Sequence, residues 1–148
     1  MNFKNVLKNG TFCLNLKGET KEEIIEELVD AMVAEGKVTD RQAALDAVFE
    51  RERKMSTGMQ HGVAIPHGKT GTIDDMVVAF GLKKDGVDFK AIDGEHSRIF
   101  VMTISSNLRA GPHIQYLSEI SKQLNRESIR ARLLEAQTSE EVVGILTE

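Results

Sequence analysis

The chain has 148 residues, of which 41% are hydrophobic, and its formal net charge at pH 7 is −4. This length predicts one domain over residues 1–148, large enough to bury a core that needs no disulfide. The mild negative charge, without blocks of like charge, argues against nucleic acid as a partner, because phosphate binding needs a basic face.

The cysteine content and the hydropathy pattern predict a soluble cytoplasmic domain without membrane insertion. The single cysteine, Cys13, excludes an intramolecular disulfide and indicates a reducing compartment. It lies in an alternating apolar stretch, which favours a buried structural thiol over a reactive one. The N-terminus lacks the apolar core of a signal peptide, and no apolar run approaches the roughly 20 residues of a membrane helix.

The first third of the chain predicts helices around one short strand. Residues 20–23 and 39–42 have the form of capping boxes, in which Thr20 and Thr39 would cap the helices that follow. Gly36 is expected to end the first of these helices. The expected elements are, in order, a helical turn over 3–7, a strand over 12–16, a helix from the first box to Gly36 and a helix from the second box to about Lys54.

The middle of the chain predicts the strands of a sheet. Residues 63–65 are a short apolar run, which Pro66 closes because proline lacks the N–H that a central strand needs. The runs over 76–82 and 99–104 are apolar on both faces, which predicts interior strands. The Asp-Gly pairs at 85–86 and 93–94 are interpreted as turns that bracket a short segment over 87–89.

The last third of the chain predicts helices. Apolar residues recur at helical spacing in two stretches, and Asn125-Arg126 separates them. A further capping box at 138–141 starts a terminal helix. The periodic residues are Ile114, Leu117, Ile120 and Leu124, followed by Ile129, Leu133 and Leu134.

Helices at both ends and strands in the middle do not follow strict βαβ alternation. This order predicts an α/β fold, a single-domain mixed β-sheet flanked by helices on both faces.

His67 is the first candidate for a chemical role, because it follows Pro66 at the end of a strand and precedes Gly68. Imidazole can be a neutral nucleophile near pH 7. For one ring nitrogen to attack, the other should donate its proton to a fixed acceptor such as a backbone carbonyl. Gly68 is interpreted as space for a closely approaching partner. The plainer alternative is an ordinary surface or core histidine.

His113 and Arg51 are the other candidates. His113 begins the helix whose apolar stripe continues through Leu117, so it is expected to face inward, where the helix N-terminus favours anions and a neutral imidazole. A packing role at the helix start is an equal alternative. Arg51 shares a helical face with Val48 and Met55 and is either an anion clamp or half of a structural ion pair.

The remaining histidines carry weaker hypotheses. His61 precedes the apolar run, and His96 follows an Asp-Gly turn. A metal site is disfavoured, because no HxxxH pair on a helix and no cysteine-containing ligand cluster is present. The sequence also contains no phosphate-binding glycine loop and no serine nucleophile elbow. No cofactor or metal is therefore expected.

The segment around His67 carries a family resemblance. Ser56-Thr57-Gly58 followed by Gly62-Val63-Ala64-Ile65-Pro66-His67-Gly68-Lys69 resembles the signature of the fructose/mannitol-type (type 2) enzyme IIA domains of the bacterial phosphoenolpyruvate:sugar phosphotransferase system. That family includes the nitrogen-regulatory enzyme IIA proteins. The resemblance extends over nearly the whole chain, through Arg51-Glu52, the segment 87–94 and the helix that begins at His113.

The resemblance implies a phosphotransferase with a phosphohistidine intermediate. It implies that His67 accepts a phosphoryl group on Nε2 from phospho-HPr, a small histidine phosphocarrier, and passes it to an enzyme IIB in sugar uptake. It further implies that His113 is a supporting histidine and that Arg51 is the arginine of the site. The alternative is a stand-alone regulatory enzyme IIA, which binds target proteins according to its phosphorylation state.

Overall fold

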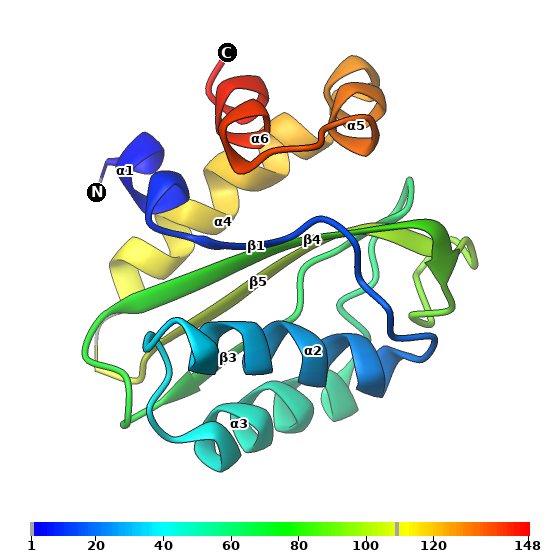
Figure 1. Cartoon of the computed structure of the whole chain (residues 1–148). Coiled ribbons are helices and arrows are strands. Elements are labelled where there is room, and N and C mark those ends of the chain that lie inside the picture. The colour runs from blue at the N-terminus through cyan, green and yellow to red at the C-terminus, as the bar shows by residue number, and fades with distance from the viewer. Residues whose placement is uncertain (1, 109) are drawn as a thin grey trace.

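The computed structural model describes residues 2–108 and 110–148 as a mixed β-sheet between two layers of helices (Figure 1). The α/β fold with helices on both faces is therefore confirmed. The helices are α1 (Phe3–Lys8), α2 (Lys21–Ala34), α3 (Arg41–Lys54), α4 (Ala110–Leu124), α5 (Glu127–Leu134) and α6 (Ser139–Leu146). The strands are β1 (Thr11–Cys13), β2 (Val63–Ala64), β3 (His67–Thr70), β4 (Met76–Val87) and β5 (Ser97–Ser106).

The two long strands, β4 and β5, form the centre of the sheet. They pair antiparallel, with Phe80 opposite Val101. β1 pairs parallel with the outer side of β4, and β2 and β3 both pair parallel with the other side of β5. Residues 78–82 and 99–104 are buried, and Met76 and Val77 are half-buried, because these strands have neighbours on both sides and helices on both faces. The interior positions predicted for 76–82 and 99–104 are therefore confirmed.

Two cores fill the space between the sheet and the helices. Along β5, Phe100, Met102 and Ile104 belong to the core under α2 and α3, whereas Ile99 and Val101 belong to the core under α1, α4, α5 and α6. This alternation follows from the two-residue period of a strand. Figure 1 shows the two helical layers, with both chain termini on the side of α4.

Pro66 interrupts the edge of the sheet, but the chain continues beyond it as a strand. β2 and β3 lie one after the other along β5, and the carbonyl oxygen of Pro66 accepts a hydrogen bond from the N–H of Thr103 at 3.1 Å. His67 is thus the first residue of β3 and lies opposite Thr103, rather than in a loop. The prediction of a strand end at Pro66 was therefore correct, but the strand that resumes there was missed.

Several predicted boundaries differ from the structure. Thr20 and Thr138 are N-caps as expected, but α3 is capped by Asp40, whose carboxylate accepts from the N–H of Ala43 at 3.0 Å. Aspartate is at least as good an N-cap as threonine, so the helix begins one residue later. The predicted turn at 85–86 lies inside β4, where the pairing with β5 is irregular and Gly86 has a φ of +78°.

The buried stripe of α4 matches the prediction at Ile120 and Leu124, which are both buried. Ile114 is 62% exposed, however, and the first turns of the helix bury His113 and Tyr116 instead. Tyr116 lies four residues before Ile120, which is also a helical spacing, and only the packing of α4 on β5 selects this residue. The inward orientation predicted for His113 is confirmed.

Gly68 allows β3 to lie directly against α3. A β-carbon at this position would lie 2.7 Å from the carbonyl carbon of Ala47 and 2.8 Å from the backbone nitrogen of Val48. Both atoms belong to the backbone of α3, which cannot move aside as a flexible side chain can. The interpretation of Gly68 as space for a partner protein was therefore wrong, because the close neighbour is a helix of the same chain.

We expect Gly68→Ala to lower the free energy of unfolding by roughly 2–3 kcal/mol, because the added methyl group forces β3 and α3 apart. Gly144→Ala is the matched control, since Gly144 lies in α6 and a β-carbon there would meet nothing within 4 Å. That change should stabilise the protein by up to about 1 kcal/mol through helix propensity. Urea unfolding measures both, and equal effects of the two substitutions would contradict the packing argument.

Candidate functional site

A pocket of about 500 Å³ at the edge of the sheet brings the three candidate residues together. It is lined by Arg51 from α3, His67 from β3 and His113 from α4. The three elements are far apart in the chain, and they meet because β3 contacts α3 on one side while α4 packs across β5 on the other. The sequence predicted the residues, and the fold provides their proximity.

His67 has one ring nitrogen engaged. Its Nδ1 lies 2.8 Å from the carbonyl oxygen of Ile65. A carbonyl oxygen can only accept, so Nδ1 carries the proton and donates it, and Nε2 keeps its lone pair. This is the arrangement that an attacking Nε2 requires.

His113, in the first turn of α4, lies beside His67 of β3. The ring centroids are 5.5 Å apart, and the ring planes are inclined by 55°. The side chain of His113 is only 4% exposed, and its Nδ1 has no hydrogen-bond partner among the described residues. A purely packing role would leave this buried polar atom unexplained, because such atoms are normally paired.

Both histidines are held in their neutral form at pH 7. Burial lowers the pKa of His67, and the positive charges of Arg51 and Lys69 lower it further, although the hydrogen bond to Ile65 and the negative charge of Glu52 oppose them. Burial also lowers the pKa of His113 to about 4, with smaller contributions from His67 and Lys69. A neutral imidazole has a lone pair available for nucleophilic attack.

The burial of His113 predicts a pH dependence of stability. His113 takes up a proton near pH 6.5 in the unfolded chain but only near pH 4 in the folded protein, so the unfolded chain binds more protons between these values. The stabilisation is complete above pH 6.5 and is lost as the pH falls towards 4, with a total of about 3 kcal/mol. His67 contributes in the same direction.

Urea unfolding between pH 7.5 and 4.5 measures this dependence. His113→Gln should flatten the curve over this range, because glutamine does not titrate. His96→Gln should leave the curve as it is in the unmodified protein, since His96 is exposed and does not line the pocket. A curve for His113→Gln as steep as that of the unmodified protein would contradict the assignment.

Arg51 lines the pocket near the end of α3. Its Nη1 donates to the carbonyl oxygen of Met55 at 2.7 Å, and among the described residues no carboxylate forms an ion pair with it. Met55 was expected on the buried face but is 70% exposed, because α3 ends at Lys54 and the next residue is extended. Of the two hypotheses for Arg51, the geometry favours the anion clamp over the structural ion pair.

Two lysines at the pocket were not predicted as site residues. Lys69 lies two residues after His67 in β3, so both lie on one side of the strand. Recognising that a strand begins at His67 would have revealed Lys69. Lys54, interpreted as ordinary surface charge, also lines the pocket. Together with Arg51 these lysines outnumber Glu50, the one acidic residue that lines the pocket, so the rim is positive on balance.

His61 and His96 are both exposed and lie outside the pocket. The backbone N–H of His61 donates to a carboxylate oxygen of Asp93 at 3.0 Å, and His61 has a φ of +65°. Within residues 2–108 and 110–148, no three histidine, cysteine or acidic side chains are grouped as metal ligands would be. In the same part of the chain, no helix combines the length and the apolar character that crossing a membrane requires.

A family model described as "Phosphoenolpyruvate-dependent sugar phosphotransferase system, EIIA 2" matches residues 5–148. The chain belongs to this family. The resemblance inferred from the signature around His67 is therefore confirmed, and the chain is a phosphocarrier-type component of the phosphotransferase system.

Curated relatives of this EIIA chain include two fructose-specific proteins. The "PTS system fructose-specific EIIA component" of Haloferax volcanii is 40% identical over 129 residues, covering 87% of this chain and 84% of that protein. The "PTS system fructose-specific EIIABC component" of Bacillus subtilis is 36% identical over 148 residues, covering all of this chain. This chain spans only 23% of the length of the Bacillus protein.

Solved structures of EIIA proteins share the fold. The nitrogen regulatory protein IIA-Ntr of Neisseria meningitidis has a TM-score of 0.87 and 27% identity, with 97% of each chain covered. The enzyme IIA of the Escherichia coli mannitol system, solved in complex with phosphorylated enzyme IIB, has a TM-score of 0.77 and 26% identity, with 93% of this chain and 94% of that chain covered.

Proposed function

We propose that this chain accepts a phosphoryl group from phospho-HPr on Nε2 of His67 and passes it to an enzyme IIB in sugar uptake. The observation that carries the proposal is the 2.8 Å contact between Nδ1 of His67 and the carbonyl oxygen of Ile65, which leaves Nε2 as the nucleophilic atom in a pocket with a positive rim. Family membership supports the phosphotransfer chemistry.

The proposed step is a displacement between two nitrogen atoms. The lone pair of Nε2 attacks the phosphorus of the phosphohistidine of HPr, the bond to the nitrogen of HPr breaks, and that nitrogen keeps the electron pair. The transferred group carries negative charge on three equatorial oxygens. Arg51, Lys54 and Lys69 supply positive charge where these oxygens would lie, and neutral His113 supplies a nearby polar ring.

In the onward transfer this chain is the phosphoryl donor, and an enzyme IIB is the acceptor. A nucleophile of enzyme IIB attacks the phosphorus, the bond to Nε2 breaks, and Nε2 keeps the electron pair, which returns His67 to its neutral form. The E. coli mannitol enzyme IIA has been solved with phosphorylated enzyme IIB, which supports a IIB-type acceptor for a chain of this fold. We propose no cofactor, because the donors and cations of the chain itself serve this transfer.

A regulatory role is the second candidate, because the fold is similar to that of a nitrogen regulatory IIA with a TM-score of 0.87. In that role phosphorylated His67 is a switch, whose added charge changes which target proteins bind. The fructose-specific relatives, at 36% and 40% identity, favour transport.

Phosphotransfer from phospho-HPr to the purified chain, and then to a series of enzyme IIB proteins, tests both candidates. Transport predicts that the label moves rapidly to a fructose-type IIB and returns the chain to its unlabelled form. A chain that accepts the label but passes it to no IIB supports the regulatory role. Failure of phospho-HPr to label the chain would contradict both.

A further inference from the structure

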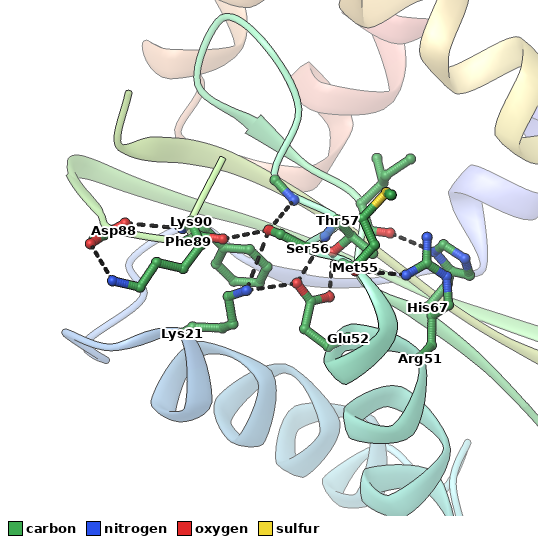
Figure 2. A network of polar contacts seen from close by, with 12 residues as sticks. Lys21, Arg51, Glu52, Met55, Ser56, Thr57, His67, Asp88, Phe89 and Lys90 are labelled. Carbon is green, nitrogen blue, oxygen red and sulfur yellow. Dashed lines mark hydrogen bonds and ion pairs between the residues drawn. The ribbon is translucent and has the colours of Figure 1, made fainter. Parts of the chain in front are cut away.

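Glu52, the neighbour of Arg51 in α3, is a buried carboxylate with a complete set of donors (Figure 2). It is only 7% exposed. Its Oε1 accepts from Nζ of Lys21 and from the backbone N–H of Thr57, both at 2.8 Å, and its Oε2 accepts from Oγ1 of Thr57 at 2.7 Å. A charge at such a position is tolerated only when it is paired and hydrogen-bonded in this way.

Lys21 anchors this carboxylate to the first turn of α2. Its Nζ also donates to Oγ of Ser56 at 3.3 Å and lies 4.9 Å from the centre of the Phe89 ring. The hydroxyl of Ser56 in turn donates to the carbonyl oxygen of Phe89 at 2.6 Å. The residues that follow α3 are thus held to two other parts of the fold, and Figure 2 shows these contacts converging on Ser56 and Thr57.

A short series of hydrogen bonds leads from Glu52 to the ring of His67. Thr57 donates twice to Glu52, and its carbonyl oxygen accepts from the N–H of Ile65 at 3.0 Å. The carbonyl oxygen of Ile65 then accepts from Nδ1 of His67 at 2.8 Å. Pro66, the residue between them, is held to β5 through its own carbonyl. The Ile65 carbonyl, which orients His67, is therefore fixed by the hydrogen bond of Ile65 to Thr57 on one side and by that of Pro66 to β5 on the other.

We propose that Glu52 is a positioning residue for His67: through Thr57 it holds the Ile65 carbonyl, which sets the Nδ1–H tautomer and the orientation of the ring. This inference rests on the proposed function for its effect on rate, but its effect on the tautomer does not depend on phosphotransfer. Without the fixed carbonyl, the ring proton can move from Nδ1 to Nε2, and Nε2 then has no lone pair with which to attack. The hydrogen-bond partners of functional histidines commonly fix the tautomer and the ring orientation in this way.

The test compares Glu52→Gln with a matched pair at Thr57. Glutamine keeps the shape of Glu52 but loses the charge that pairs with Lys21, and its NH2 group replaces one of the two oxygens that accept from Thr57. Thr57→Val removes the hydroxyl while keeping the side-chain shape, and Thr57→Ser keeps the hydroxyl. Nitrogen-15 NMR of the imidazole rings at pH 7.5 reports the tautomer of His67, and rapid-quench labelling reports the rate of phosphoryl uptake from phospho-HPr.

We expect the Nδ1–H tautomer in the unmodified protein and in Thr57→Ser, and a mixture of tautomers in Glu52→Gln and Thr57→Val. Uptake should fall by about 10- to 100-fold in the latter two, as when a reactive group is misplaced. Ile129→Val is the control for lost stability alone, because Ile129 is buried in α5 on the opposite face of the sheet from α3. It should change neither the tautomer nor the rate.

The outcomes separate this inference from the proposed function. Folded Glu52→Gln with the tautomer and rate of the unmodified protein would overturn the positioning role and leave Glu52 as a structural ion pair. If Glu52→Gln fails to fold, the Thr57 pair decides, and equal tautomers in Thr57→Val and Thr57→Ser would overturn the proposal. A shifted tautomer in a protein that phospho-HPr never labels would support positioning and contradict the phosphocarrier function.

Discussion

His67→Ala is expected to abolish labelling of the chain by phosphoenolpyruvate, enzyme I and HPr. Alanine has no nucleophile, and the neighbouring His113 is too buried to replace it. The fold should remain intact, because His67 lies on an edge strand and is partly exposed. Radioactive phosphate labelling followed by gel electrophoresis measures the loss, and circular dichroism checks the fold.

His61→Ala is the control for this substitution, since His61 is exposed and lies outside the pocket. It should be labelled to the same stoichiometry as the unmodified protein. Stoichiometric labelling of folded His67→Ala would refute the assignment of His67 as the phosphoryl acceptor.

His113→Ala should still become labelled, but it should pass the group to enzyme IIB about 100-fold more slowly. The nucleophile is retained, so labelling goes to completion, whereas the transition state loses a polar group that lies 5.5 Å from the His67 ring, centroid to centroid. Single-turnover transfer from the labelled chain to enzyme IIB measures the rate.

The unfolding midpoint of His113→Ala, measured in parallel, separates lost stability from lost chemistry. His96→Ala, which alters an exposed histidine outside the pocket, should transfer at the rate of the unmodified chain. If uptake and onward transfer are both unchanged in His113→Ala, then His113 is a packing residue, which is the alternative that the sequence left open.

Much of the fold follows from local patterns. Thr20 and Thr138 cap helices because their side chains satisfy N–H groups of the first turn, and this depends on residues only three positions away. The central strands are apolar on both faces, which is a local pattern that predicts burial between two helical layers. The predictions failed where two local solutions were equivalent, as with Ile114, which was expected on the buried face of α4 where Tyr116 lies, and with the Asp-Gly pair inside β4.

The site was predicted less completely than the fold. His67 could be singled out from its neighbours Pro66 and Gly68 alone, and His113 and Arg51 from helical spacing. Glu52 was missed as a candidate, because a carboxylate in a charged helix end carries no local sign that it is buried. Its burial depends on Lys21, which lies 31 positions away in the sequence.

The sequence by itself determined the kinds of element, the mixed sheet, the family and the histidine that bears the proposed chemistry, because periodicity, caps and a contiguous signature are local properties. Only the tertiary structure decided what surrounds that histidine. It showed that Gly68 lets β3 pack directly against α3, and that His67 and His113 share a pocket. These features depend on contacts between distant segments, and such contacts exist only once the sheet has brought α3, β3 and α4 together.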